Sequence, residues 1–140
     1  MRPTKQIALD MGCCYIFDEW GRINLRADKV PIGETLIAET LTMNGTFDFT
    51  FSPIVKTSRT AMFAFLKHCD LDFKGDDIGD IEWEMERVGK MFIKRLNDSG
   101  LYEPITMQDF NGTLAFLDSN MAGVMATITL TEIAGECIDG

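Results

Sequence analysis

The sequence lacks every short motif that marks a common catalytic or cofactor site. It contains no dinucleotide-binding G-x-G-x-x-G, no P-loop, no zinc-protease H-E-x-x-H and no hydrolase G-x-S-x-G pattern. Its four cysteines form neither a C-x-x-C pair nor a zinc-ligand spacing, and His68 is the single histidine. We therefore expect no metal site, no cofactor, no catalytic residues and no enzymatic activity.

Long apolar runs are also missing. No run approaches the roughly 18 residues that a membrane-spanning helix needs, so we expect no membrane association. The first residues contain no apolar stretch of the secretory kind, which predicts synthesis in the cytoplasm with reduced thiols.

One catalytic arrangement stays open, with Cys13 or Cys14 as a nucleophile and His68 as its base. The neighbouring Cys69 cannot pair with His68, because adjacent side chains of a strand point to opposite faces. Since no activating group is recognisable, a structural role for His68 is the favoured interpretation.

The stretch from Asp70 to Asp76 resembles the start of a calcium-binding loop. An EF-hand needs an oxygen ligand at its fifth place and a glutamate at its twelfth, where this chain has Lys74 and Ile81. A turn ahead of a helix is the alternative, and it is the one we expect.

Acidic residues outnumber basic ones, giving a net charge of -9 and a pI of about 4.5. A surface of this sign does not neutralise phosphates, so the composition argues against nucleic-acid binding over the whole molecule. Ten phenylalanines and nine methionines stand out. These side chains are expected to form mostly the core of the domain. In the alternative, part of the set lies at a subunit interface.

The length fits a single domain over residues 1–140. A short helix is expected within residues 3–14, with Pro3 in its first turn and Thr4 as a competing cap. Short extended pieces are expected at Tyr15–Phe17 and Ile23–Leu25. The conformation of residues 1–33 is the part that the sequence determines least.

Alternating or apolar patterns predict strands in the middle of the chain. Glu34–Met43 and Thr46–Phe51 flank Asn44-Gly45, which predicts a hairpin between them, and Pro53 ends the second strand. Arg59–Lys67 is apolar on both faces, which favours a central, covered strand.

The segment Asp77–Ser99 has the clearest helical pattern. Its apolar residues fall on one stripe, Asp77 is a plausible N-cap, and Gly100 follows where a helix often ends. The stripe comprises Ile78, Ile81, Met85, Val88, Phe92, Ile93 and Leu96. Strands are expected after it at Leu114–Leu117 and Gly123–Ile133. The predicted fold is α+β: an antiparallel sheet of about five strands with one long amphipathic helix packed on it and a short N-terminal helix.

Trp83 lies away from the apolar stripe of this helix. Arg87, Lys90 and Lys94 share its outward side. Tryptophan and arginine are enriched at binding hot spots, so these four residues are the candidate subunit interface. Cover by a neighbouring loop, or stacking of Arg87 on Trp83, are equally compatible alternatives.

The order of elements resembles that of the tail-terminator and head–tail connector (neck) proteins of tailed bacteriophages. The likeness is carried mainly by GKMFIKRLNDSGLYEPI at residues 89–105 and FLDSNMAGVMATITLTE at residues 116–132. Both stretches are similar to phage or prophage proteins of Bacteroides-type bacteria.

This resemblance implies a virion structural protein that forms a homo-oligomeric ring, such as a hexamer, around the DNA channel. It implies contacts with other phage tail or connector proteins, and passage of DNA without sequence-specific binding. The protein would be made in the host cytoplasm and end in the virion. A small cytoplasmic module that binds a ligand or partner, without catalysis, is the alternative. Neither the number of subunits nor the face that lines the channel follows from the sequence.

Overall fold

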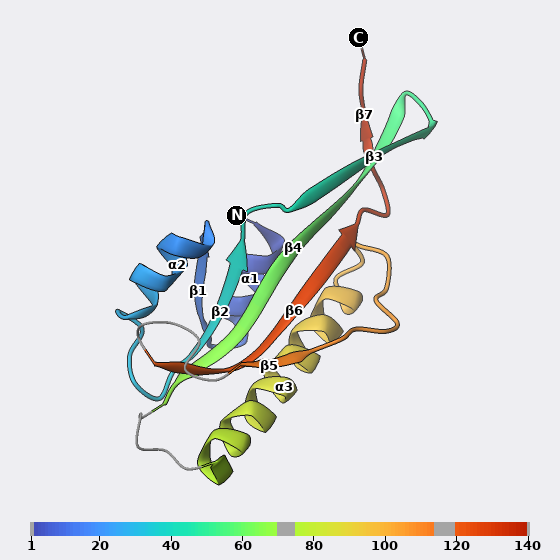
Figure 1. The fold of residues 1–140 in the computed structure, drawn as a ribbon. Coiled ribbons are helices and arrows are strands. Elements are labelled where there is room, and N and C mark those ends of the chain that lie inside the picture. The colour runs from blue at the N-terminus through green and yellow to red at the C-terminus, as the bar shows by residue number, and fades with distance from the viewer. Residues whose placement is uncertain (1, 70–74, 114–119, 140) are drawn as a thin grey trace.

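The computed structural model describes residues 2–69, 75–113 and 120–139, and within these it has an α+β fold with three helices and seven strands. All seven strands belong to one sheet (Figure 1). The elements in chain order are α1 (Pro3–Asp10), β1 (Cys14–Asp18), α2 (Trp20–Ala27), β2 (Thr35–Thr40), β3 (Asn44–Phe51), β4 (Ile54–His68), α3 (Gly75–Asp98), β5 (Asn111–Thr113), β6 (Met121–Thr131) and β7 (Glu136–Cys137).

The sheet is mixed, which corrects the expectation of an antiparallel sheet of about five strands. Its main order is β1-β2-β4-β6-β5, and β1 runs parallel to β2 while the other pairs are antiparallel. Parallel neighbours need a crossover connection, and α2 provides it. The predicted extended piece at Ile23–Leu25 was therefore wrong: Ile23 and Ala27 lie on the buried side of this helix.

The central strand β4 organises the sheet. Its 15 residues pair along one side with β2 and then with β3, and along the other side with β6 and then with β7. The predicted hairpin at Asn44-Gly45 was wrong, because β2 and β3 do not pair with each other. Gly45 instead lies opposite Arg59 inside the β3–β4 ladder, and the turn falls at Ser52-Pro53, whose peptide bond is cis.

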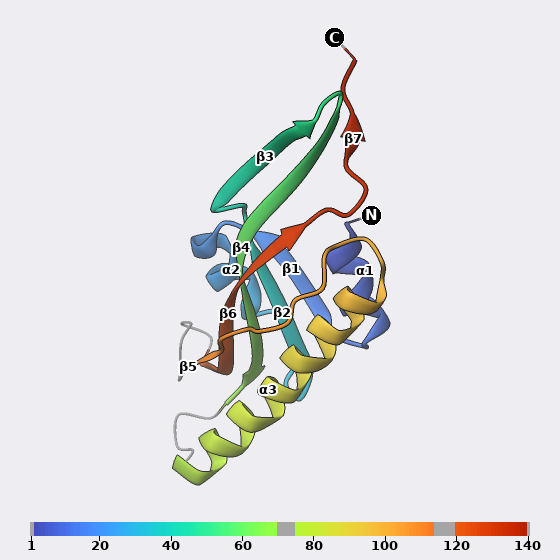
Figure 2. The ribbon, with the colours of Figure 1, turned by 90° about the vertical axis from the view of Figure 1, so that its right-hand side faces the viewer.

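Helices cover both faces of the sheet (Figure 2). On one face α1 and α3 pack over Phe63 and Phe65, and on the other α2 packs over Ala64 and Leu66. This confirms that β4 is central and buried on both sides. The ring of Phe92 on α3 lies 5.5 Å from the rings of both Phe63 and Phe65.

The long helix matches its predicted stripe, since Met85, Phe92 and Leu96 are all buried. It begins at Gly75, so Asp77 lies inside the helix and is not its N-cap. Gly100 has φ +73°, the left-handed conformation that favours glycine just beyond a helix. In the described residues no helix combines the length and apolar character required to cross a membrane.

Close backbone contact explains one glycine of β6. A Cβ on Gly123 would lie 1.9 Å from the carbonyl oxygen of Phe65, so only glycine lets β6 approach β4 there. The predicted strand Gly123–Ile133 is confirmed as β6, which starts at Met121. The predicted strand Leu114–Leu117 and most of the calcium-like stretch, residues 70–74, lie outside the described residues.

Candidate functional site

A hairpin formed by β3 and the first half of β4 projects beyond the helices (Figure 1). We call β3, the turn at residues 52–53 and Ile54–Thr57 the arm. All eight residues of β3 are exposed, among them Phe47 at 57%, Phe49 at 62% and Phe51 at 70%. The arm therefore presents aromatic side chains that its own chain does not cover.

The arm projects because β4 extends beyond the part of the sheet that the helices cover. Phe47 pairs with Thr57, while α1 and α3 pack only farther along the strand, from Ala61 onward. The register shifts between Asp48 and Phe51, a β-bulge that increases local twist. Within the described residues β3 is hydrogen-bonded to β4 alone, so its outer edge is an unpaired strand edge.

The C-terminal segment lines the other side of the arm. Cys137 pairs with Ile54, and the backbone N–H of Ile138 donates to the carbonyl of Pro53 at 2.8 Å. Ile54 and Ile138 are 37% and 52% exposed, so they extend the apolar character of the arm.

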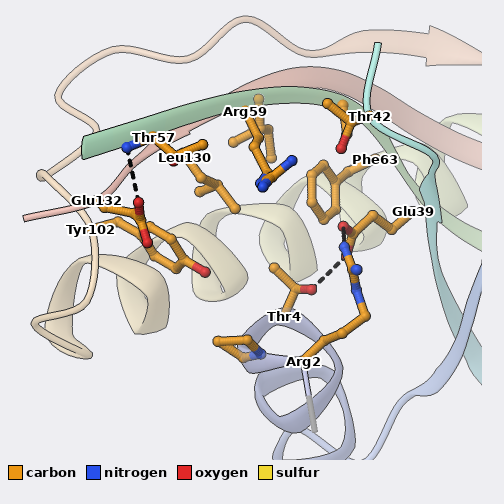
Figure 3. A pocket seen from close by; sticks show the side chains of 13 residues that line it. Arg2, Thr4, Glu39, Thr42, Thr57, Arg59, Phe63, Tyr102, Leu130 and Glu132 are labelled. Carbon is orange, nitrogen blue, oxygen red and sulfur yellow. Dashed lines mark hydrogen bonds and ion pairs between the residues drawn. The ribbon is translucent and has the colours of Figure 1, made fainter. Parts of the chain in front are cut away.

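A cavity of about 210 Å³ lies beside the base of the arm, between the start of α1, the sheet and Tyr102 (Figure 3). Its floor is the part of β4 and β6 that α3 leaves uncovered. The apolar members of its lining are Ala61, Phe63, Ile128 and Leu130, and the polar members include Arg2, Thr4, Glu39, Thr42, Thr57, Arg59 and Glu132.

One wall of the cavity is built around the buried carboxylate of Glu39, which is 3% exposed. It accepts hydrogen bonds from Arg2 at 2.6 Å, from the Thr4 hydroxyl at 2.5 Å and from the Tyr15 hydroxyl at 2.7 Å. Burial is the main cause that raises the pKa of Tyr15 to about 12; the hydrogen bond with Thr4 acts in the opposite direction, and the hydrogen bond to Glu39 and its charge raise the pKa further. A carboxylate this deep is tolerated because it accepts these three hydrogen bonds, and the cluster fixes α1 on the sheet. Thr4 thus serves this cluster and does not cap α1, whose N-cap is Arg2.

The two arginines of the cavity differ in their partners. Arg2 is held by Glu39, and its guanidinium carbon lies 3.7 Å from the centre of the Phe17 ring. Arg59 extends from β4 into the cavity (Figure 3) and forms no ion pair with any residue in the described ranges. The cavity therefore combines apolar side chains of β4 and β6 with a largely polar remainder of its lining, in which Arg59 has no ion-pair partner among the described residues.

The four residues proposed from the sequence lie on the outer side of α3. Trp83 is 73% exposed, and Arg87, Lys90 and Lys94 are exposed as well. Lys94 forms an ion pair with Asp98 of the same helix at 2.7 Å. Trp83 sits in the first half of α3, whose start lies at the opposite end of the molecule from the arm (Figure 1). Their contact with another subunit stays a prediction.

The cysteines and the histidine make structural contacts. His68 Nε2 lies 2.7 Å from the carbonyl oxygen of Val30, and the Cys69 thiol donates to the carbonyl of Asn120. Burial, followed by the nearby carboxylate of Glu34, raises the pKa of Cys14 to about 11. A nucleophilic thiol needs the opposite shift. No group of three or more potential metal ligands comes together within the ranges described.

Sequence reasoning missed the cavity and the exposure of the arm, although a signal for each was present. Glu39 follows the apolar run from Leu36 to Ala38 in β2, and such a carboxylate must find donors when the strand is buried. Phe47, Phe49 and Phe51 were recognised as one face, but alternation alone does not tell whether the chain itself covers that face.

Comparison of the chain with known protein families, with curated proteins and with solved structures finds no match in any of the three. The arm, the cavity and the outer side of α3 are therefore the observations from which a function can be argued.

Proposed function

We propose that the protein is a non-catalytic structural subunit that assembles with further copies into a ring of the phage tail-terminator or head–tail neck class. The observation that carries this proposal is the arm: eight consecutive exposed strand residues with three phenylalanines among them. Since each aromatic side chain has ~150–250 Å² to bury, these three present on the order of 400 Å² of apolar surface. A patch of that size usually marks an interaction site.

The unpaired edge of β3 supports the same conclusion. Exposed strand edges invite pairing with another chain, and proteins usually block them with charges, proline or a covering segment. The edge of β3 carries a single charged residue, Asp48, between exposed phenylalanines. An edge of this kind fits a strand that is covered on assembly.

Two unlike surfaces support a ring over a two-fold dimer. The arm is apolar and strand-like, whereas the cavity beside its base is a concave surface lined in part by Arg59 and Glu132. When the patch that a subunit offers differs from the patch that it receives, contacts repeat head to tail and close into a ring at a suitable angle. A hexamer, and contacts with tail or connector proteins, are what the phage resemblance implies.

The net charge of -9 fits a channel that DNA traverses. An acidic lining repels phosphate, so DNA would pass without being held and without sequence recognition. In this proposal the protein is made in the host cytoplasm and ends in the virion.

A second candidate is a binding module without catalysis, favoured by the cavity beside Arg59. Such a module would act as a monomer or dimer and hold a small ligand that joins an aromatic or aliphatic body to an anionic group. The two candidates differ in the mass of the particle in solution.

Light scattering during size-exclusion chromatography tests the proposal. We expect the native chain to elute as a large multiple of 15.7 kDa. We expect replacement of Phe47, Phe49 and Phe51 by serine to give the monomer mass. A matched control replaces Ile32 and Met107, which are 88% and 90% exposed, by serine and should keep the ring. A native chain that stays monomeric or dimeric at the highest concentration reached would contradict the proposal.

A further inference from the structure

We propose that the arm of one subunit inserts its phenylalanines into the cavity beside Arg59 of the next copy. This inference rests on the self-assembly proposed above and names the surfaces that make it. It assigns two roles to every chain, a donor arm and an acceptor cavity.

The cavity matches an aromatic ring in size. Apolar cavities of about 150 Å³ in proteins accept a benzene molecule, and this one measures about 210 Å³. Phe63, Ile128 and Leu130 supply apolar contacts from β4 and β6. By volume, the cavity is therefore large enough for one phenylalanine ring.

Arg59 matches the face of such a ring. A guanidinium within about 6 Å of a ring centre is attracted to its π electrons, most strongly when the contact excludes water. The chain already contains one example, in which Arg2 lies 3.7 Å from the centre of the Phe17 ring. Arg59 has no such ring and no carboxylate partner among the described residues, so an incoming phenylalanine would complete its environment.

The arm cannot fill the cavity of its own chain. Phe47 is fixed opposite Thr57, and Gly45 opposite Arg59, by the ladder between β3 and β4. The ladder holds β3 in the plane of the sheet, beside the strand that forms the cavity floor. The occupant must therefore come from another molecule.

The arm itself favours a second copy as that occupant, because every copy presents Phe47 and Phe49 uncovered beside an edge of β3 that is unpaired in the described residues. Asp48 alternates with these phenylalanines and lies opposite Lys56, so its carboxylate is on the other face of β3 and stays outside the cavity of the receiving copy. The donor and acceptor patches also differ, so each copy gives one arm and receives one, as a closed ring requires.

Mixing two complementary variants tests this inference. The donor-deficient variant carries Phe47→Asp and Phe49→Asp and keeps an intact cavity. The acceptor-deficient variant carries Ala61→Phe, which fills the cavity, and keeps an intact arm. Because Ala61 is buried and this change can disturb folding, a second acceptor-deficient variant carries Arg59→Glu at an exposed position. Each variant alone should be monomeric by native mass spectrometry.

An equimolar mixture of donor-deficient and acceptor-deficient chains should form a one-to-one heterodimer and no ring. One intact arm then meets one intact cavity, and the two defective surfaces end the chain of contacts. The Arg59→Glu variant should give the same heterodimer when mixed with the donor-deficient variant.

The possible failures are distinguishable. If the native chain forms a ring but neither mixture forms a heterodimer, the arm-in-cavity contact is wrong while the proposed assembly stands. If the native chain does not self-associate, both are wrong. If the Ile32→Ser and Met107→Ser control also loses the ring, assembly does not depend specifically on the arm, and the inference is overturned.

Discussion

Replacing Phe92 or Phe49 with alanine separates the phenylalanines that stabilise the fold from those available for assembly. Phe92 is fully buried, and its ring packs 5.5 Å from two other phenylalanine rings. Its removal leaves a cavity in the centre of the sheet–helix interface, which costs about 3–5 kcal/mol. Domains of this size are usually stable by about 5–15 kcal/mol, so Phe92→Ala should lose a large part of the total.

Phe49→Ala should behave differently. The ring is 62% exposed, so the folded monomer loses little on its removal, and the free energy of unfolding should change by less than about 0.5 kcal/mol. Urea denaturation measures both values, and it must be done below the concentration at which the chain assembles, because association adds to apparent stability.

The contrast between the two variants is the result that matters. If Phe49→Ala destabilises the monomer as much as Phe92→Ala does, then β3 is packed on its own body. In that case the arm does not exist in solution.

Four further predictions concern other groups. The phenolate absorbance of Tyr15 should appear only near pH 12. Because this pKa lies above the unfolded value of 10, the unfolded chain loses the proton first, and the free energy of unfolding should fall as the pH rises from 10 to about 12. Glu39→Ala removes the acceptor of three buried or half-buried donors, and it should lower the free energy of unfolding, measured by urea denaturation, by about 2 kcal/mol. Glu39→Gln should lower it by roughly half as much. Cys14 has a pKa of about 11, so roughly one thiol in a thousand is ionised at pH 8, and mass spectrometry should find it alkylated much more slowly than the exposed Cys137. A gel-shift assay at low salt should show no binding of duplex DNA by a protein with a net charge of -9, and a shifted band would contradict a repelling channel.

The elements with a strong periodic pattern were predictable from the sequence. The apolar stripe of α3 and the two apolar faces of β4 each have one arrangement that buries them, and the structure has that arrangement. Short elements were less predictable, because α2 has only eight residues and Ile23 fits either a strand or a helix in so small a window.

The hairpin error has a different cause. Asn44-Gly45 is a strong local turn signal, but β4 is long enough to pair with β2 and β3 one after the other. Tertiary pairing along that strand outweighs the local preference, and Gly45 becomes an ordinary ladder residue.

The candidate site was the least predictable part. Arg2, Glu39 and Arg59 are far apart in the sequence, and only the packing of α1 on the sheet brings them to one cavity. The exposure of Phe47 depends on where the helices end on the sheet, which no local pattern contains. Trp83, in contrast, could be recognised because an amphipathic helix has a definite outer side.

The most direct test of self-assembly through the arm is the native mass of the unmodified chain beside that of the Phe47→Asp and Phe49→Asp variant. We predict a ring of many copies of the 15.7 kDa chain for the first and a folded monomer for the second. Equal masses for the two proteins, whether both monomeric or both assembled, would contradict it.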